Sequence, residues 1–256
     1  MKTRVLREQR LSFWRVSPVV DVPELGDSVH EMWVELFSLA AEPPAPWVLI
    51  GAQMVALHGW ARGRTRIRPS EDADLLVNVR TVAKGTELMG RALSKRGYRF
   101  DGASPEGVGH RFRSGQVSLD VLGPDGLGPN TSLRVTAGAH TVEVPGGSQA
   151  LKRAEEFTVQ SRTMTGRVPI PSLLGAILVK VRAINVDDNA EAQRRDVAFL
   201  LSIVEDPESL GRDLAQSERK WLREHDYFAE SSHQSYEGLA EAEDAAIVYR
   251  RLADVR

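Results

Sequence analysis

Two aspartates, Asp72 and Asp74, have the spacing in this sequence that most directly suggests chemistry. Leu75, Leu76 and Val77 follow them directly, an apolar run typical of a buried strand. Because side chains alternate between the two faces of a strand, both carboxylates are expected to project from the same face. Two carboxylates so close together repel each other and need a cation, and the hard, oxygen-binding Mg²⁺ fits best. The pattern therefore predicts a magnesium site.

A third carboxylate, Asp120, is expected on another strand. Residues 116–122 alternate between apolar and polar positions, which places Ser118 and Asp120 on one face of that strand. Taken alone, Asp120 would be interpreted as an exposed residue of an edge strand. In the company of Asp72 and Asp74, the preferred interpretation is that it belongs to the same metal site.

The residues before Asp72 predict the elements that must position it. Residues 47–50 form an apolar run typical of a buried strand, and Gly51 interrupts that run. Residues 52–58 have the composition of a helix, which Gly59 is expected to close. The sequence therefore predicts a strand and a short helix leading to the acidic strand.

Further elements are expected on either side of this segment. An amphipathic helix is predicted over residues 29–40, with Asp27 and Ser28 as its cap. Another is predicted over residues 81–96 and should end at Gly97. The segments 98–100 and 110–113 flank a loop rich in Gly and Pro and are interpreted as a hairpin.

The chain is expected to be helical from Ser172 to its end, and a boundary is placed between a domain of residues 1–168 and a helical domain of residues 169–256. Lys180 lies at the border of the apolar stripe of the first of these helices, and Asp196 lies at the edge of the stripe of the next. Taken alone, this pair is best interpreted as an ion pair between helices. The lysine could also reach into a site.

Composition excludes several classes of function. The 256 residues contain no cysteine, which excludes thiolate catalysis, thiolate metal sites and disulfides. The formal net charge is −2, so any attraction to nucleic acid must come from a local patch. The amino-terminal residues lack the apolar core of a signal peptide, and no segment has the continuous apolar length of a membrane span. A soluble, cytoplasmic protein without a membrane partner is expected.

Five elements in order resemble the nucleotidyltransferases of the DNA polymerase β superfamily, and within it the AbiEii-type toxin branch. They are Gly51-Ala52, the segment Leu57-His58-Gly59 with the following Arg68-Pro69-Ser70-Glu71-Asp72-Ala73-Asp74, then Asp120, Lys180 and Arg194-Arg195-Asp196. The resemblance covers residues 47–204. It implies an α/β (α+β) fold, in which a mixed sheet with flanking helices is followed by a helical carboxy-terminal region. It also implies Mg²⁺-dependent transfer of a nucleotide from an NTP to an acceptor hydroxyl.

The resemblance also implies roles for single residues. Asp72, Asp74 and Asp120 would bind Mg²⁺, and Asp120 would help to deprotonate the acceptor. The residues implied in binding the NTP are Gly51, Ala52, Arg68, Ser70 and Lys180. Lys180 and Asp196 would complete the catalytic set. Family members often carry serine where this chain has Ala52, and the branch usually has threonine where it has Ser70.

The acceptor implied by the branch is an RNA 3′ end, plausibly that of a tRNA. Alternating arginines at positions 62, 64, 66 and 68 would form a cationic ladder if the loop is extended, and Arg111 and Arg113 could add to an RNA-binding rim. The simpler interpretation of such a charge run is a solvated loop.

Three classes of function stay open at this point. The preferred one is a nucleotidyltransferase, plausibly the toxin of a toxin–antitoxin system, with RNA, a protein or a small molecule as its acceptor. The second is a catalytically inactive, nucleotide-binding regulatory module. The third is an interaction protein whose carboxy-terminal helices bind an antitoxin protein.

Overall fold

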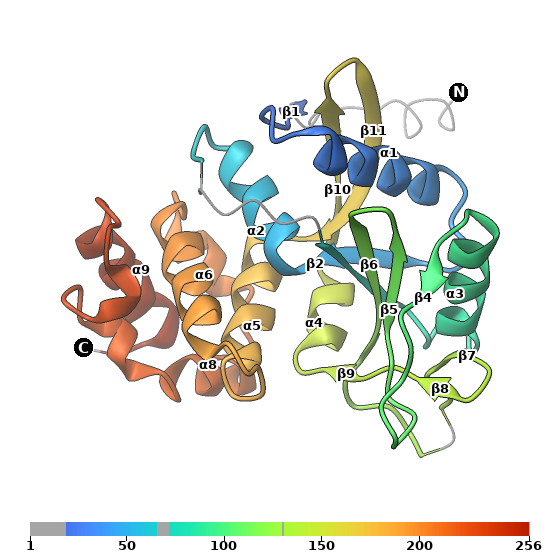
Figure 1. Ribbon diagram of the computed structural model, residues 1–256. Coiled ribbons are helices and arrows are strands. Elements are labelled where there is room, and N and C mark those ends of the chain that lie inside the picture. Colours follow the sequence, from blue (N-terminus) through green and yellow to red (C-terminus); the bar gives the residue numbers. More distant parts are fainter. Residues whose placement is uncertain (1–18, 66–71, 130, 256) are drawn as a thin grey trace, which may run out of the picture.

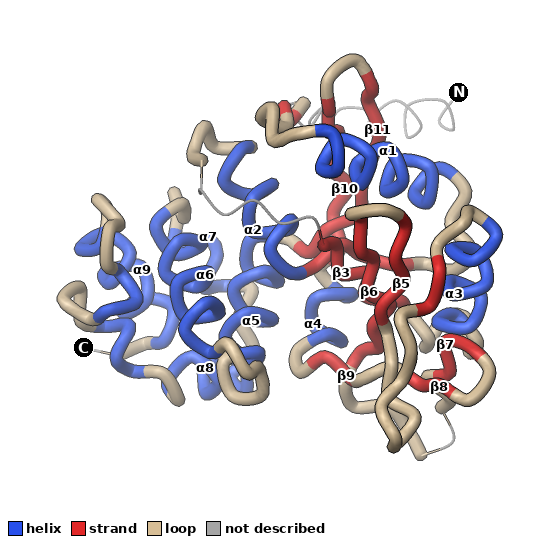
Figure 2. The backbone as a smooth tube through the Cα atoms, in the orientation of Figure 1, coloured by secondary structure: helices blue, strands red, loops and turns tan. Residues whose placement is uncertain are grey.

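The computed structural model describes residues 19–65, 72–129 and 131–255. Helices and strands are mixed along this chain, and Figures 1 and 2 show the strands gathered on one side of the molecule and most of the later helices on the other. The fold is α/β (α+β), as the sequence predicted, with a mixed sheet and a helical carboxy-terminal region. Within the described residues, no helix combines the length and the apolar character that a membrane span requires.

The central sheet contains the predicted acidic strands as neighbours. Its spatial order is β2 (Trp47–Ile50), β3 (Asp72–Val77), β6 (Val117–Pro124), β5 (Arg111–Ser114) and β4 (Arg99–Phe100), with β9 (Glu143–Val144) paired to the end of β6. Strands β3 and β6 run parallel, and the pairs β2–β3, β6–β5 and β5–β4 are antiparallel. The hairpin predicted around residues 98–113 is confirmed as β4 and β5.

Two smaller sheets complete the strands. One contains β1 (Val20–Asp21), β10 (Ala154–Ser161) and β11 (Met164–Pro171), and the other pairs β7 (Arg134–Thr136) with β8 (Ala139–His140). The long β10–β11 hairpin was not anticipated from the sequence. Many of its residues are polar or exposed, so its apolar alternation is weak.

The helices fall into two groups. Those among the strands are α1 (Asp27–Ala41), α2 (Gly51–Trp60), α3 (Gly85–Lys95) and α4 (Gly147–Lys152). The carboxy-terminal group contains α5 (Leu173–Ala183), α6 (Ala190–Ser202), α7 (Pro207–Arg212), α8 (Gln216–Arg223) and α9 (Ala242–Ala253), with the short 3₁₀ turns Asp226–Ala229 and Gln234–Tyr236 between α8 and α9.

Three helix ends differ from the sequence predictions. Helix α1 begins at Asp27 itself, after Gly26, and no side chain caps it. Helix α3 begins only at Gly85, because residues 81–84 form turns. Helix α2 continues through Gly59 to Trp60. The predicted end of α3 is confirmed, since Gly97 follows the helix with a φ of 91°.

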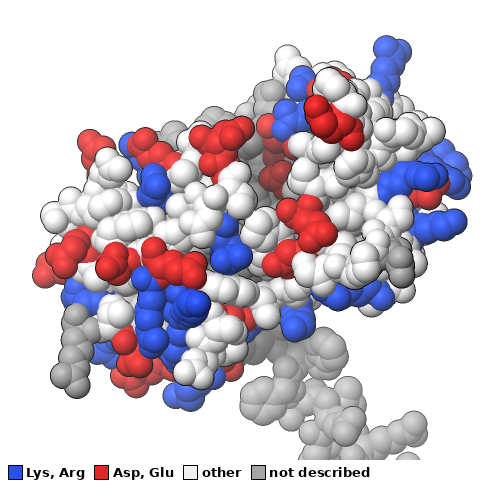
Figure 3. Space-filling model, turned by 90° about the horizontal axis from the view of Figure 1, so that it is seen from below, with Lys and Arg blue, Asp and Glu red and all other residues white. Residues whose placement is uncertain are grey.

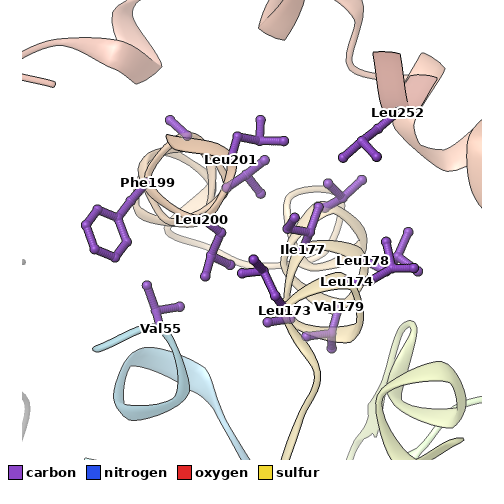
Figure 4. Packing of buried hydrophobic residues seen from close by; sticks show 14 of the residues in the cluster. Val55, Leu173, Leu174, Ile177, Leu178, Val179, Phe199, Leu200, Leu201 and Leu252 are labelled. Atoms are coloured by element: carbon purple, nitrogen blue, oxygen red, sulfur yellow. The ribbon is translucent and has the colours of Figure 1, made fainter. Parts of the chain in front are cut away.

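Two hydrophobic cores lie on opposite faces of the central sheet. The first packs α1 and α3 against the face that carries Ala73, Leu75 and Val77. The second packs α2 and the carboxy-terminal helices together, and it includes Leu76 from the other face. Figure 4 shows α5 and α6 side by side in this second core, with Val55 of α2 and Leu252 of α9 nearby.

The predicted domain boundary between residues 168 and 169 falls inside β11. The second core also crosses it, because sheet residues such as Ile50 and Leu76 belong to the same cluster as Ile177 of α5. The division into two domains stays a prediction. The two hydrophobic cores are separated by the central sheet and not by the predicted boundary.

Candidate active site

Gly51 and Asp74 meet where β2 turns directly into α2. The register of the sheet pairs Ile50 with Asp74, which brings the carboxylate beside the next residue, Gly51. Gly51 has a φ of 73°, in the left-handed region, and a Cβ at this position would overlap Oδ2 of Asp74. The carboxylate therefore occupies the space that any other side chain at position 51 would need.

Asp72, Asp74 and Asp120 come together as the sequence predicted. Asp74 pairs directly with Asp120 across the parallel strands β3 and β6, and Asp72 pairs with Ser118. Neighbouring strands lie about 4.8 Å apart, so the two carboxylates are close. Burial raises the pKa of the Asp74 carboxyl to about 6, and the charge of Asp120 adds to this effect while Lys180 opposes it.

Arg111 holds the third carboxylate from the neighbouring strand. The β5–β6 register pairs Arg111 with Asp120, and the guanidinium donates two hydrogen bonds, 2.8 Å from Nε to Oδ1 and 2.7 Å from Nη2 to Oδ2. The same Nη2 lies 3.9 Å from Oδ2 of Asp72. His110 contributes a weaker contact, with 3.7 Å between Nε2 and Oδ2 of Asp120. Hydrogen bonding to Asp120 raises the pKa of Arg111 further, so it stays charged.

Lys180 and Asp196 form the ion pair between helices that the sequence suggested. Nζ of Lys180 lies 2.8 Å from Oδ2 of Asp196, and both side chains are buried. Nζ also donates to Oε1 of Gln193 at 2.8 Å. Ser172 caps α5 and Asn189 caps α6, so the two helices that carry this pair have well-defined starts.

Residues of both sets line one cleft of about 900 Å³ between the sheet and the α5–α6 pair: Asp72, Asp74 and Arg111 from the sheet, and Lys180, Gln193 and Asp196 from the helices. Asp120 lies beside this cleft, paired with Asp74 on the neighbouring strand. Its charged lining residues are Asp72, Asp74, Glu143, Asp187 and Asp196 on the acidic side, against Arg111 and Lys180. Acidic residues outnumber basic ones, so the cleft attracts cations. Its apolar lining residues include Val142, Val144, Ala183 and Val186.

The donors present fit Mg²⁺ in part. Within residues 19–65, 72–129 and 131–255, no group of three acidic or histidine side chains is arranged to hold a metal ion. At Asp120, both carboxylate oxygens accept hydrogen bonds from Arg111. Asp72 and Asp74 still line the cleft, and Mg²⁺ commonly takes one or two protein carboxylates together with substrate phosphates. Ligation by Asp120 stays a prediction.

The residues predicted to bind the NTP are placed only in part. Gly51 and Ala52 line the cleft at the amino-terminal end of α2, a position that favours anions. Lys180 lines it from the opposite side. Arg68 and Ser70 lie outside the described residues.

The described arginines of the predicted RNA rim contact the protein itself. Arg62 lies in a turn and donates to the carbonyl oxygen of His58, and Arg64 pairs with Glu241. Arg113 pairs with Asp101 at 2.9 Å. Arg62 therefore lies in a turn and not in an extended loop, while the ladder stays a prediction for Arg64, and Arg66 and Arg68 lie outside the described residues.

Sequence reasoning did not identify some of the lining residues. Gln193 precedes Asp196 by three positions on α6, and this helical spacing could have identified it. Asp187 accepts a hydrogen bond from the Gln193 amide at 2.6 Å. Glu143 lies in a segment rich in Gly and Pro, and only its pairing with β6 brings it to the cleft.

Comparisons of the chain with protein-family models, with curated proteins and with solved structures found no match. The function therefore has to be inferred from the geometry of the cleft and from the resemblance of the motifs.

Proposed function

We propose that the protein is a Mg²⁺-dependent nucleotidyltransferase that moves a nucleoside monophosphate from an NTP to an acceptor hydroxyl. One observation carries the proposal. Asp72 and Asp74 face the same cleft as Lys180, and Asp120 lies beside them on the neighbouring parallel strand. Paired carboxylates next to a lysine are suited to handling a metal-bound polyphosphate.

The charge of the cleft supports a metal-bridged substrate. Its lining contains five acidic residues and two basic ones, Arg111 and Lys180. A triphosphate without a counterion would be repelled by such a surface. A divalent cation between the phosphates and the carboxylates of Asp72 and Asp74 would turn this repulsion into attraction.

Different residues of the cleft would bind the metal ion, the phosphates and the acceptor's proton. Asp72 and Asp74 would hold Mg²⁺, which when bound lowers the pKa of an acceptor hydroxyl and neutralises a leaving pyrophosphate. The backbone amides of Gly51 and Ala52 would donate to phosphate oxygens at the start of α2. Lys180 would pair with a phosphate as a point charge, oriented by Asp196. Asp120 would accept the proton of the acceptor.

For the acceptor, we propose the RNA 3′ end of a tRNA, and with it the role of a toxin that an antitoxin protein restrains. This part depends on the resemblance to the AbiEii-type branch. On the face shown in Figure 3, acidic and basic side chains are intermixed and neither covers the face alone. An RNA contact on this face would therefore be local, and a protein or a small molecule is the alternative acceptor.

A second candidate is an inactive nucleotide-binding module, and one contact favours it. Both oxygens of Asp120 accept hydrogen bonds from Arg111, so a metal ion or a proton would have to compete with the guanidinium for that carboxylate. Ala52 also lacks the hydroxyl that active relatives often have at this position.

The test is a transfer assay with the full chain. Purified protein is incubated with each labelled NTP in turn, Mg²⁺ and total RNA, and the Asp72→Ala/Asp74→Ala double variant is assayed in parallel. We expect labelled RNA with the wild type and none with the double variant, because the variant cannot hold the metal. The double variant should keep its circular-dichroism spectrum, since both side chains face the cleft.

Two outcomes would redirect the proposal. NTP binding without transfer to RNA, protein or small molecules would favour the inactive module. Equal transfer by the wild type and the double variant would show that Asp72 and Asp74 are not needed for the reaction.

A further inference from the structure

Arg111 contacts two of the carboxylates that are predicted to bind the metal ion. Its guanidinium bridges Asp120 and Asp72, with 2.7 Å to Oδ2 of the first and 3.9 Å to Oδ2 of the second. The guanidinium therefore places its positive charge next to the same carboxylates that would bind a metal ion. Asp120 is buried while Arg111 keeps 33% of its side chain exposed, so the arginine has space to leave and the aspartate does not.

The pair differs from the other arginine of the same strand. Arg113 is two residues further along β5 and projects from the same face, but its partner Asp101 lies outside the cleft and both side chains are about half exposed. An exposed pair of this kind contributes little to stability or binding. Arg111 is set apart by its two-fold hydrogen bonding to a buried carboxylate beside the cleft.

We propose that Arg111 is a built-in competitor of the metal ion: its guanidinium neutralises Asp120 and Asp72 while the metal is absent, and it must release Asp120 before that carboxylate can bind a cation. This inference depends on the metal site of the proposed function. It makes Arg111 a positioning residue that sets how tightly the cleft holds a divalent cation before a nucleotide arrives. Once released, the guanidinium faces the cleft, where the anionic groups of a substrate would be its next partners.

The experiment measures Mn²⁺ binding to the full chain without nucleotide, by titration followed with electron paramagnetic resonance of the free ion. Four proteins are compared: the wild type, Arg111→Gln, Arg111→Lys and Arg113→Gln. Arg111→Gln removes the competing charge, so we expect its Mn²⁺ affinity to exceed that of the wild type about tenfold. Arg111→Lys keeps the charge without the two-pronged geometry and should fall between them.

Arg113→Gln is the matched control, and its affinity should stay within about twofold of the wild type. Loss of the Arg111 partner leaves Asp120 buried and uncompensated, so the melting temperature of Arg111→Gln in EDTA should fall and should recover when Mn²⁺ is added. If Arg111→Gln fails to fold, Arg111→Lys tests the same inference, because its Mn²⁺ affinity should also exceed that of the wild type, by a smaller factor.

Unchanged or weaker Mn²⁺ binding by both Arg111 variants would overturn the inference while leaving a metal site in place. Absence of Mn²⁺ binding in all four proteins would overturn it together with the metal in the proposed function. Tighter binding by Arg111→Gln without any nucleotidyl transfer would support the inference and contradict the proposed reaction.

Discussion

At the scale of single residues, the contact between Gly51 and Asp74 sets the shape of the cleft floor. A left-handed φ and the adjacent carboxylate both require glycine at position 51. The same contact keeps Asp74 at the start of α2, where its carboxylate lies close to Asp120. A substitution here should therefore affect both stability and the site.

Gly51→Ala is expected to lower the free energy of unfolding by about 3 kcal/mol or more, because the new methyl group is strained by the backbone and overlaps Asp74. The measurement is urea denaturation followed by circular dichroism. Gly63→Ala is the matched control: Gly63 has a φ of 66°, and among the described residues no atom beyond its chain neighbours lies within 4 Å of the place a Cβ would take, so the backbone cost of about 1 kcal/mol applies. Equal losses in the two variants would refute the overlap.

At the scale of elements, α5 and α6 are joined beside the sheet by one buried ion pair. Lys180 and Asp196 come from different helices and both line the cleft. A buried pair of this kind is costly to break on one side, because the remaining charge stays desolvated. Since the same cleft contains Gly51 and Asp74, the pair links helix packing to the geometry of the site.

Lys180→Met is expected to destabilise the protein by about 3–5 kcal/mol, since it removes the ammonium group that lies 2.8 Å from the buried Asp196 carboxylate. The double variant Lys180→Met/Asp196→Leu should lose less than this single variant. Arg251→Met provides the comparison, because its pair with Glu208 is exposed and should contribute no more than about 1 kcal/mol. A double variant less stable than Lys180→Met in urea denaturation would contradict this account of the pair.

Within single strands and helices, local sequence patterns predicted part of the site. The alternation around Asp72 and Asp120 correctly placed their side chains, because period-two patterning is a local property. An ion pair between helices was the simpler interpretation of Lys180 and Asp196, and the structure contains it. The bond between Arg111 and Asp120 was not predicted, because it depends on the register between strands, which no local pattern specifies. Local composition also offered little sign of the β10–β11 hairpin.

At the scale of the whole molecule, the carboxy-terminal helices complete the core beneath the site. Ile50 and Leu76 of the sheet pack in one cluster with Ile177 of α5 and Leu200 of α6. Without these helices, that face of the sheet would expose its apolar residues to water. The helical region is thus a structural requirement for the sheet as well as one wall of the cleft.

A fragment of residues 1–171, which keeps all of β11, is therefore expected to lack a cooperative unfolding transition and to bind the dye ANS. Near-ultraviolet circular dichroism during thermal unfolding, with the full chain measured alongside, makes the comparison. A fragment that melts cooperatively with native-like near-ultraviolet signal would show that residues 1–168 fold as an independent domain, as the sequence first suggested.

The proposed function requires the acidic cleft to bind a nucleotide through a metal ion at Asp72 and Asp74. Its most direct test is equilibrium binding of fluorescent NTP analogues to the wild type and to Asp72→Asn/Asp74→Asn, with Mg²⁺ and with EDTA. We predict binding by the wild type that requires Mg²⁺ and is lost in the double variant, because the lining of the cleft is predominantly acidic. Equally tight binding in EDTA, or by the double variant in Mg²⁺, would contradict the claim.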